Sequence, residues 1–262
     1  MIQIYAIFLR QFLLIKRSFH RLLGIFYWSF LELLLWGFLT VYLNRIGEDR
    51  LSVVTVLIGT VILWNFLMRV QQGVGISFLE DVWSRNLMNL FASPLKLWQY
   101  IAGLVFVGTA GAFISVGVMA LVARFLFSYS FFQYGILMIP FIFILFFFGL
   151  GLGLYTTAMI LRFGPSSELL AWSIPALIPP FSGVFYPVST LPQWLQYVAF
   201  FLPSSHVFEG MRAVLLTGTM DMNSLIFASA LAVIFSIGAL TLLYRSYRYV
   251  LRHGHLTRFQ TE

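Results

Sequence analysis

Long apolar stretches separated by short polar ones dominate the chain. The apolar runs extend over 22–43, 51–68, 97–123, a stretch within 125–161, 169 to about 188, and 222–244. A helix needs about 20 apolar residues to cross the hydrocarbon core of a bilayer, and each run is long enough to hold one such helix. The pattern predicts an all-α membrane protein with six transmembrane helices.

The fifth run is continued by a stretch that prolines interrupt. From Leu169 to Phe208 the chain has no charged residue, yet it is too long for one span and too broken for two. Lipid offers no partner to the free N–H and C=O groups of broken backbone, so protein or water must provide one. We expect a re-entrant outer segment over 190–221, before the last helix, that lines or caps a pathway. The candidate residues of this outer region are Gly183, Pro187, Pro192, Trp194, Pro203, Glu209 and Arg212.

Polar residues just after Pro203 have a structural interpretation. Glu209 and Arg212 are three residues apart, a spacing that predicts an ion pair on one helix face. Ser204 and Ser205 follow the proline and are expected to cap the same helix. A hydrolase site is disfavoured, because no nucleophile motif accompanies these residues.

The first 21 residues have an amphipathic pattern. Gln3, Arg10, Arg17 and Arg21 fall on one stripe of a helix, and the sequence has no small-residue cleavage site of the kind that ends a signal peptide. A basic helix of this kind lies in the membrane interface with its cations toward lipid phosphates. The alternative is an early start to the first span.

Between the second and third runs lies a connection rich in both charge and aromatic residues. Glu80, Asp81 and Arg85 stand among Phe78, Trp83 and Leu87, and Pro94 follows. The spacing predicts an amphipathic helix over 78–94 that ends or kinks at the proline. Such a helix either docks into a groove on another protein or rests on lipid headgroups.

Composition and charge agree with a membrane protein. Hydrophobic residues make up 60% of the chain and charged residues 10%, against about a quarter in soluble domains, and the mean hydropathy is +0.92. The net charge of +7 indicates anionic lipid headgroups as partners, and no nucleic acid is needed to explain it. With no cysteine and four scattered histidines, no metal site is expected.

The distribution of cations predicts the orientation. With both termini on the cytoplasmic side, twelve Lys and Arg residues lie inside and four, Arg45, Arg50, Arg124 and Arg212, lie outside. This excess follows the positive-inside rule.

A few polar and aromatic residues lie within the predicted spans. Glu32 is near the middle of the first, where a charge is expensive unless it is paired, neutral or functional. Arg69 is a candidate partner, or it extends to the interface. The candidates for a pathway are Glu32, Trp36, Trp64, Asn65 and Phe181, with interfacial anchoring as the alternative for the tryptophans.

Small residues in the third and fourth runs have a simpler interpretation. Gly108, Ala112, Gly149, Gly151 and Gly153 lie inside apolar stretches with no soluble strand before them. We interpret them as sites of close helix packing.

The stretches FLEDVWSRNLMNLFASPLKLWQYIAG and FSGVFYPVSTLPQWLQYVAFFLPSSHVFEGMRAVLL, in this order, carry a family resemblance. The chain resembles the membrane subunit of the ABC-2 family of ATP-binding cassette exporters over essentially its whole length. The resemblance implies one transmembrane domain over 1–262, a dimer of such subunits and two cytoplasmic ATPases that hold ATP and Mg²⁺. It also implies a coupling segment over 76–96, re-entrant outer helices and a bacterial inner membrane. The coupling residues would be Phe78, Glu80, Asp81, Trp83, Arg85, Leu87 and Pro94.

The chain has no phosphate-binding loop of its own. Such a loop needs Gly-Lys-Ser/Thr, and the two lysines, Lys16 and Lys96, stand in IKR and LKL. We therefore expect no enzyme activity and no cofactor in this chain. The expected function is export of a lipid, a glycolipid or polysaccharide, or a hydrophobic small molecule. The alternatives are a proton-coupled transporter that uses Glu32 and a membrane scaffold without transport activity.

Overall fold

The computed structural model describes residues 1–46 and 52–253, and in this part the chain forms helices and no strand. The predicted all-α class is confirmed. The α-helices are α1 (Ile2–Arg17), α2 (Phe19–Ile46), α3 (Ser52–Trp83), α4 (Leu87–Ala92), α5 (Leu97–Phe127), α6 (Met138–Phe163), α7 (Glu168–Leu177), α8 (Gln193–Phe200), α9 (Pro203–Thr217) and α10 (Met222–Arg252). Three short 3-10 helices are η1 (Phe131–Leu137), η2 (Pro165–Ser167) and η3 (Val188–Thr190).

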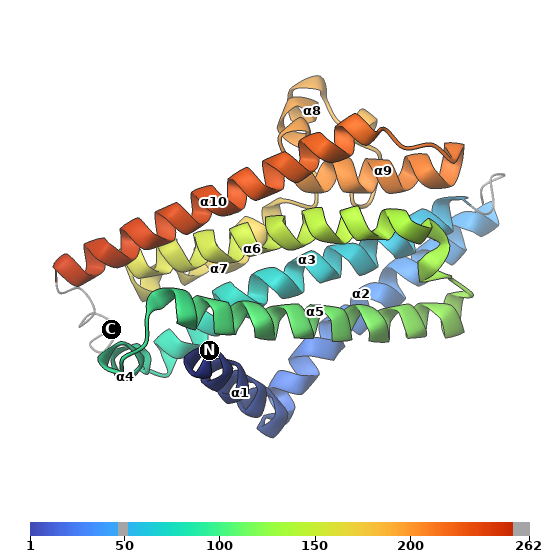
Figure 1. Ribbon diagram of the computed structural model, residues 1–262. Coiled ribbons are helices and arrows are strands. Elements are labelled where there is room, and N and C mark those ends of the chain that lie inside the picture. The colour runs from blue at the N-terminus through green and yellow to red at the C-terminus, as the bar shows by residue number, and fades with distance from the viewer. Residues whose placement is uncertain (47–51, 254–262) are drawn as a thin grey trace.

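Helix α3 is the centre of the bundle. It packs against α5 and α6, while α10 lies along α6 and α2 crosses α3 (Figure 1). Helix α1 packs on α5, and α4 lies at the same end of the bundle as α1 and the last turns of α10. We call this the α4 end. Helices α8 and α9 form a separate layer beside α10 and nearer the opposite end.

Glycines allow the central helices to approach closely. A Cβ atom placed on Gly73 of α3 would lie 2.1 Å from the Cα atom of Gly108 in α5. In α6, Gly149 and Gly153 face backbone oxygens of α3, and Gly151 faces Phe235 of α10. The predicted packing role of the small residues is confirmed at these positions.

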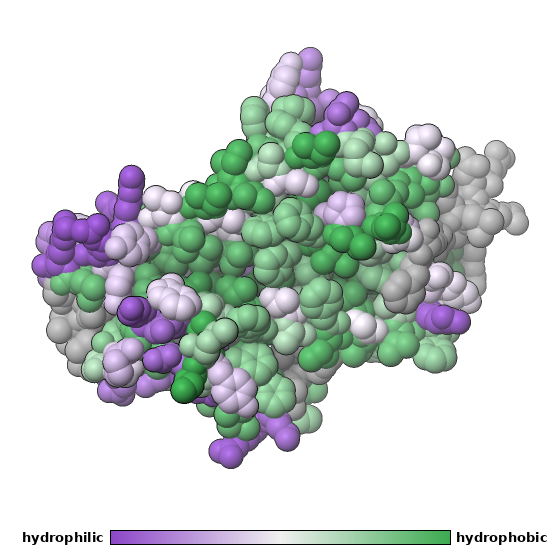
Figure 2. Space-filling model, viewed as in Figure 1, coloured by the Kyte–Doolittle hydropathy of each residue, from purple (hydrophilic) through white to green (hydrophobic). Residues whose placement is uncertain are grey.

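Among the described residues, three helices are long and apolar enough to cross a membrane: Leu97–Phe127, Tyr134–Phe163 and Met222–Arg252. They correspond to the third, fourth and sixth apolar runs. The first two runs fall largely within α2 and α3, although Arg50, the start of the second run and the tail with Arg258 lie outside the described residues. Apolar side chains cover most of the surface in Figure 2, and hydrophilic ones gather at the α4 end and at the edges.

The fifth run does not form the long helix that the sequence predicts. Helix α7 has ten residues, half of the number that a span needs. It contains Pro175 and stops before Pro179 and Pro180, which provide no N–H group to continue it. The predicted helix through about residue 188 is therefore wrong in length, and turns occupy 179–186 instead.

The N-terminal helix is shorter than predicted. It ends at Arg17, and Ser18 has an extended backbone (φ −108°, ψ 103°) that separates it from α2. Arg21 therefore belongs to α2 and not to the amphipathic helix.

The single helix predicted over 78–94 is also wrong, because the chain breaks it in two. Helix α3 continues to Trp83, and Arg85 then adopts a left-handed conformation with φ 54°. The backbone N–H of Asn86 donates to the C=O of Asp81 at 3.0 Å, the bond that commonly closes a helix at such a residue. The short α4 follows and ends before Pro94, as the sequence predicts, with Ser93 extended.

Candidate functional site

Asp81 is the main connection at the α4 end. Its carboxylate accepts hydrogen bonds from Nη1 and Nη2 of Arg10, from Gln11 at 3.4 Å and from the Tyr100 hydroxyl at 2.7 Å. The Asp81 side chain is 2% exposed, and its hydrogen bonds with Arg10 raise the pKa of the Arg10 guanidinium. Asp81 thus joins α1 and α5 to the last turns of α3. Arg10 faces the protein and not lipid phosphates, which corrects its predicted orientation, and Asp81 is not available to a docking partner.

The neighbouring carboxylate has a different environment. Glu80 is 28% exposed and pairs with Arg21 at 3.2 Å. Burial raises the pKa of the Glu80 carboxyl, and Arg21 opposes this rise. One turn later, the Trp83 indole N–H donates to Glu168 at 2.8 Å. This bond connects the end of α3 to the start of α7.

Helix α4 combines a buried face with an exposed one. Leu87 is buried, as is Phe78 near the end of α3. The Phe91 ring contacts Tyr100 of α5 and Tyr247 of α10, with ring centroids 6.0 and 5.3 Å apart. The exposed residues, which we call the α4 surface, are Arg85, Asn89, Ala92, Ser93 and Pro94. A partner that binds here reaches α3, α5 and α10 through one layer of side chains.

A polar cluster crosses the interior of the bundle. The Asn65 side-chain oxygen of α3 accepts hydrogen bonds from Ser29 of α2 and Ser115 of α5, both at 3.0 Å. The amide of Asn65 donates to Glu32 at 3.4 Å, and Arg69 donates to Ser29 at 2.8 Å. Glu32 and its candidate partner Arg69 thus belong to one network that Ser29 and Asn65 connect.

Between this cluster and the α4 end, a cavity of about 340 Å³ lies among α1, α2, α3, α5 and α7. We call it the inner cavity. Gly24 and Gly111 leave part of its wall open, since a Cβ atom on either would meet no atom within 4 Å. Its other lining includes the polar Gln11, Arg21, Arg69, Gln72, Ser77 and Glu80 and the aromatic Trp28, Trp83 and Trp172. The cavity can therefore accept a molecule with both a polar and an apolar part.

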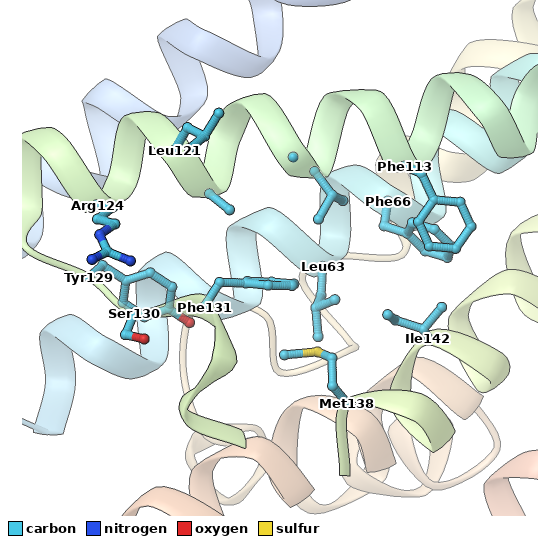
Figure 3. Close-up of a pocket in the computed structure, with 13 residues that line it drawn as sticks. Leu63, Phe66, Phe113, Leu121, Arg124, Tyr129, Ser130, Phe131, Met138 and Ile142 are labelled. Carbon is cyan, nitrogen blue, oxygen red and sulfur yellow. The ribbon is translucent and has the colours of Figure 1, made fainter. Parts of the chain in front are cut away.

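A second cavity of about 490 Å³ lies between α3, α5, η1 and α6 (Figure 3). Apolar side chains such as Phe66, Phe113 and Ile142 line one end. Arg124 and Ser130 lie at the other end. The sequence did not indicate this cavity, because its lining comes from segments far apart in the chain.

The remaining pathway candidates lie in two places. Trp64 is 5% exposed and packs in the core of the bundle. Trp36 stacks on Phe185 with ring centroids 4.1 Å apart, and Phe181 is half-buried nearby in the sequence. Helix α2 therefore contacts the beginning of the outer region through an aromatic pair.

Arg212 organises the outer region. Its guanidinium donates to the backbone oxygens of Gly183 and Val184 and pairs with Glu209 at 2.8 Å. Glu209 in turn accepts the backbone N–H of Val188 at 2.8 Å. The predicted ion pair on the helix is confirmed, and it also holds the turn at 183–188. Gly183 has φ +67°, a conformation that favours glycine.

The predicted serine cap is wrong. Helix α9 starts at Pro203 with Leu202 before it, and no side chain caps it. Ser205 donates to the Leu202 carbonyl at 2.8 Å, while Ser204 pairs with Ser182 at 2.8 Å. The Ser205 hydroxyl thus bonds to the residue before α9, and the Ser204 hydroxyl joins α9 to the turn that contains Ser182. Pro187, Pro192 and Trp194 are exposed beyond them.

Sequence reasoning missed Gln11, Tyr100 and Ser115 as partners of the two polar centres. Ser115 is a lone polar residue in an apolar run, and that isolation was an available signal, since a buried polar group requires a partner. Gln11 and Tyr100 stand beside the polar Arg10 and Gln99, so no such signal marks them in the sequence.

These features define a multi-pass, all-helical membrane protein with polar centres inside the bundle. A family model described as ABC-2 type transporter matches residues 2–216. The chain belongs to the ABC-2 type transporter family. A search of curated proteins found no match.

Membership defines the class of subunit. The chain is the transmembrane component, or permease, of an ABC transporter and works with a separate ABC ATPase subunit. Permeases of this family are not themselves the ATPases.

Proposed function

We propose that the chain is the membrane subunit of an exporter in which two copies form a pathway and two cytoplasmic ATPases, with ATP and Mg²⁺, drive it. The family match supports the partnership, and one structural observation supports the route of coupling. This observation is the position of the α4 surface, whose buried side contacts α5 and α10 and which directly follows the end of α3 anchored by Asp81. In this proposal all six apolar runs are embedded in the inner membrane, with both termini cytoplasmic.

ATP closure must change the free-energy difference between two states of the bundle, because a partner shifts an equilibrium only by differential binding. The α4 surface is where the partner makes those contacts. Phe91 passes the displacement to Tyr100 and Tyr247, and Asp81 makes α1 move with α3. The bundle then rocks as a rigid body and opens the outer region over 181–202.

The pathway lies along α2, α3 and α7. The inner cavity receives the polar part of the cargo, since Arg21, Arg69 and Gln72 are among the polar side chains that line it. The tryptophans and the neighbouring lipid accept the apolar part. The cargo that fits is an amphiphile: a lipid, a glycolipid or lipid-carried polysaccharide, or a hydrophobic small molecule.

The test concerns ATP hydrolysis by the purified complex. Asp81 is unsuitable as a coupling probe, because its replacement breaks the anchor of α1. Asn89→Glu and Ala92→Trp change only the exposed side of α4. Each should reduce copurification of the ATPase and lower stimulated hydrolysis by about tenfold, the factor that 1.4 kcal/mol of binding gives. Gln193→Glu, on exposed α8 in the outer region, is the matched control and should change neither.

Retention of full stimulated hydrolysis and export by both α4 variants would contradict the coupling assignment. One observation favours a second function, since Glu32 lies in a polar network inside the bundle. A proton-coupled carrier predicts transport that follows a proton gradient, no stimulated hydrolysis with any ATPase, and loss of transport in Glu32→Gln. A scaffold without transport activity predicts that Glu32 and the outer region tolerate substitution.

A further inference from the structure

A groove of about 1000 Å³ runs between the first half of α5 and the last half of α10. Helices α5 and α10 make little direct contact, and Leu150 and Leu154 of α6 form the floor between them. The volume lies at the upper end of the range of ligand pockets. The groove is separate from the inner cavity, which lies among α1, α2, α3, α5 and α7.

The groove opens on the lipid-facing surface. Phe106 and Leu240 on its two sides are 59% and 51% exposed, and the surface over α5, α6 and α10 in Figure 2 is mainly apolar. Exposed apolar surface of this kind is covered by acyl chains in a bilayer. A groove in it holds a chain more firmly than a flat surface does, because more atoms lie within van der Waals distance.

One end of the groove carries cations and amphipathic aromatic rings. Lys96 lies at the start of α5 next to Trp98, and Tyr244 and Tyr247 lie opposite on α10. The Arg248 guanidinium lies over the Tyr244 ring, 5.7 Å from its centroid. No acidic residue is among the lining residues of the groove. Trp and Tyr are typical of the headgroup level, and basic pockets between helices attract anionic headgroups.

We propose that this groove binds one anionic phospholipid from the leaflet at the α4 end, with an acyl chain in the groove and its phosphate at Lys96. The apolar length accounts for the chain, and Lys96, the cation among the lining residues, accounts for the preference in headgroup. The proposal depends on membrane embedding and not on ATP-driven export, so the two fail independently.

The bound lipid would also affect the α4 surface. Tyr247 lines the groove and its ring contacts Phe91 of α4. A lipid that fills the space between α5 and α10 therefore restrains Tyr247, and through Tyr247 it stabilises the position of Phe91 and α4.

The experiment uses phospholipids with dibrominated chains, which quench tryptophan fluorescence on contact. The full chain is reconstituted in phosphatidylcholine vesicles that contain either brominated phosphatidylglycerol or brominated phosphatidylcholine at equal mole fraction. Subtraction of a Trp98→Phe variant isolates the Trp98 signal. We expect brominated phosphatidylglycerol to reach Trp98 with an apparent affinity about fivefold higher, the contribution of one lysine near the surface.

Two pairs of variants separate the site from general surface charge. Lys96→Gln should abolish the preference, and Lys16→Gln, at the other lysine and also exposed, should retain it. Ala102→Leu fills the groove without removing a charge and should also abolish it. Ala230→Leu, on the exposed side of α10 away from the groove, should not.

Three results would overturn the proposal. Equal quenching of Trp98 by the two brominated lipids would show no headgroup preference. If neither brominated lipid quenched Trp98, protein such as a second copy of the chain would cover the groove. Equal loss of preference in the two lysine variants would assign the effect to the general surface potential.

Discussion

Asp81 and Arg10 are 71 residues apart in the chain and form a bidentate ion pair that fixes α1 to the end of α3. The carboxylate is buried and the guanidinium is 28% exposed, so the strength of the pair lies between that of a surface pair and a buried one.

Asp81→Ala should therefore destabilise the fold and not simply uncouple transport. It leaves Arg10 and the buried Tyr100 hydroxyl without their acceptor, which should cost about 2–3 kcal/mol. The measurement is thermal unfolding in mild detergent. Glu80→Ala is the control and should lower the midpoint much less, because Glu80 is partly exposed. Equal midpoints for wild type and Asp81→Ala would disprove the anchoring role.

The contact between Gly73 and Gly108 predicts a strong effect of one methyl group. Gly73→Ala should destabilise α3–α5 packing by about 2 kcal/mol, because backbone and not a flexible side chain occupies the space. Gly117→Ala is the matched control on α5, since its Cβ atom would meet nothing within 4 Å. Unfolding midpoints of the two variants give the comparison. A similar midpoint for both would mean that the helices separate at no cost.

Arg85 adopts a backbone conformation that favours glycine. Arg85→Gly should be neutral or stabilise by up to about 1 kcal/mol, whereas Arg85→Val should destabilise by about 1 kcal/mol or more. Asn89→Gly, in helical α4, should have the opposite sign to Arg85→Gly. If both glycine variants change stability in the same direction, the break between α3 and α4 is not where the structure places it.

Arg212 should control the order of the turn at 183–188. Arg212→Met leaves two backbone oxygens and Glu209 without their donor, while Glu209→Gln keeps an acceptor for the Val188 N–H. Since the chain has no cysteine, Val188→Cys introduces a single thiol. Its labelling rate by a thiol reagent should rise about tenfold with Arg212→Met and little with Glu209→Gln. An unchanged rate in Arg212→Met would contradict this role.

The sequence predicted the fold where local chemistry determines it. The apolar runs lie largely within helices, Pro94 follows the end of α4, and the small residues of α6 lie at helix contacts. Glu209 and Arg212 pair as their spacing indicated, because partners three residues apart on a helix need no tertiary information.

Other features depend on contacts that the sequence does not encode locally. Glu80 and Asp81 are adjacent and chemically alike, yet only Asp81 is buried, because α1 and Tyr100 pack over it. From the sequence alone, Arg10 fits a lipid-facing stripe as well as it fits an ion pair inside the protein. Only the packing of α1 against the end of α3 shows that it pairs with Asp81. Helix α7 illustrates a different limit, since the sequence shows its prolines but not which of them the helix can include: it includes Pro175 and ends before Pro179.

The short α7 has a mechanical consequence. Its first residue, Glu168, is bound to Trp83 at the end of α3, and the turns after it lead to Phe185, which rests on Trp36 of α2. The ten residues of α7 lie between these two attachments, so only the turns after the helix can absorb a displacement. A displacement of the end of α3 is therefore transmitted through the rigid α7 to the turns that carry Phe185, and so to its contact with Trp36.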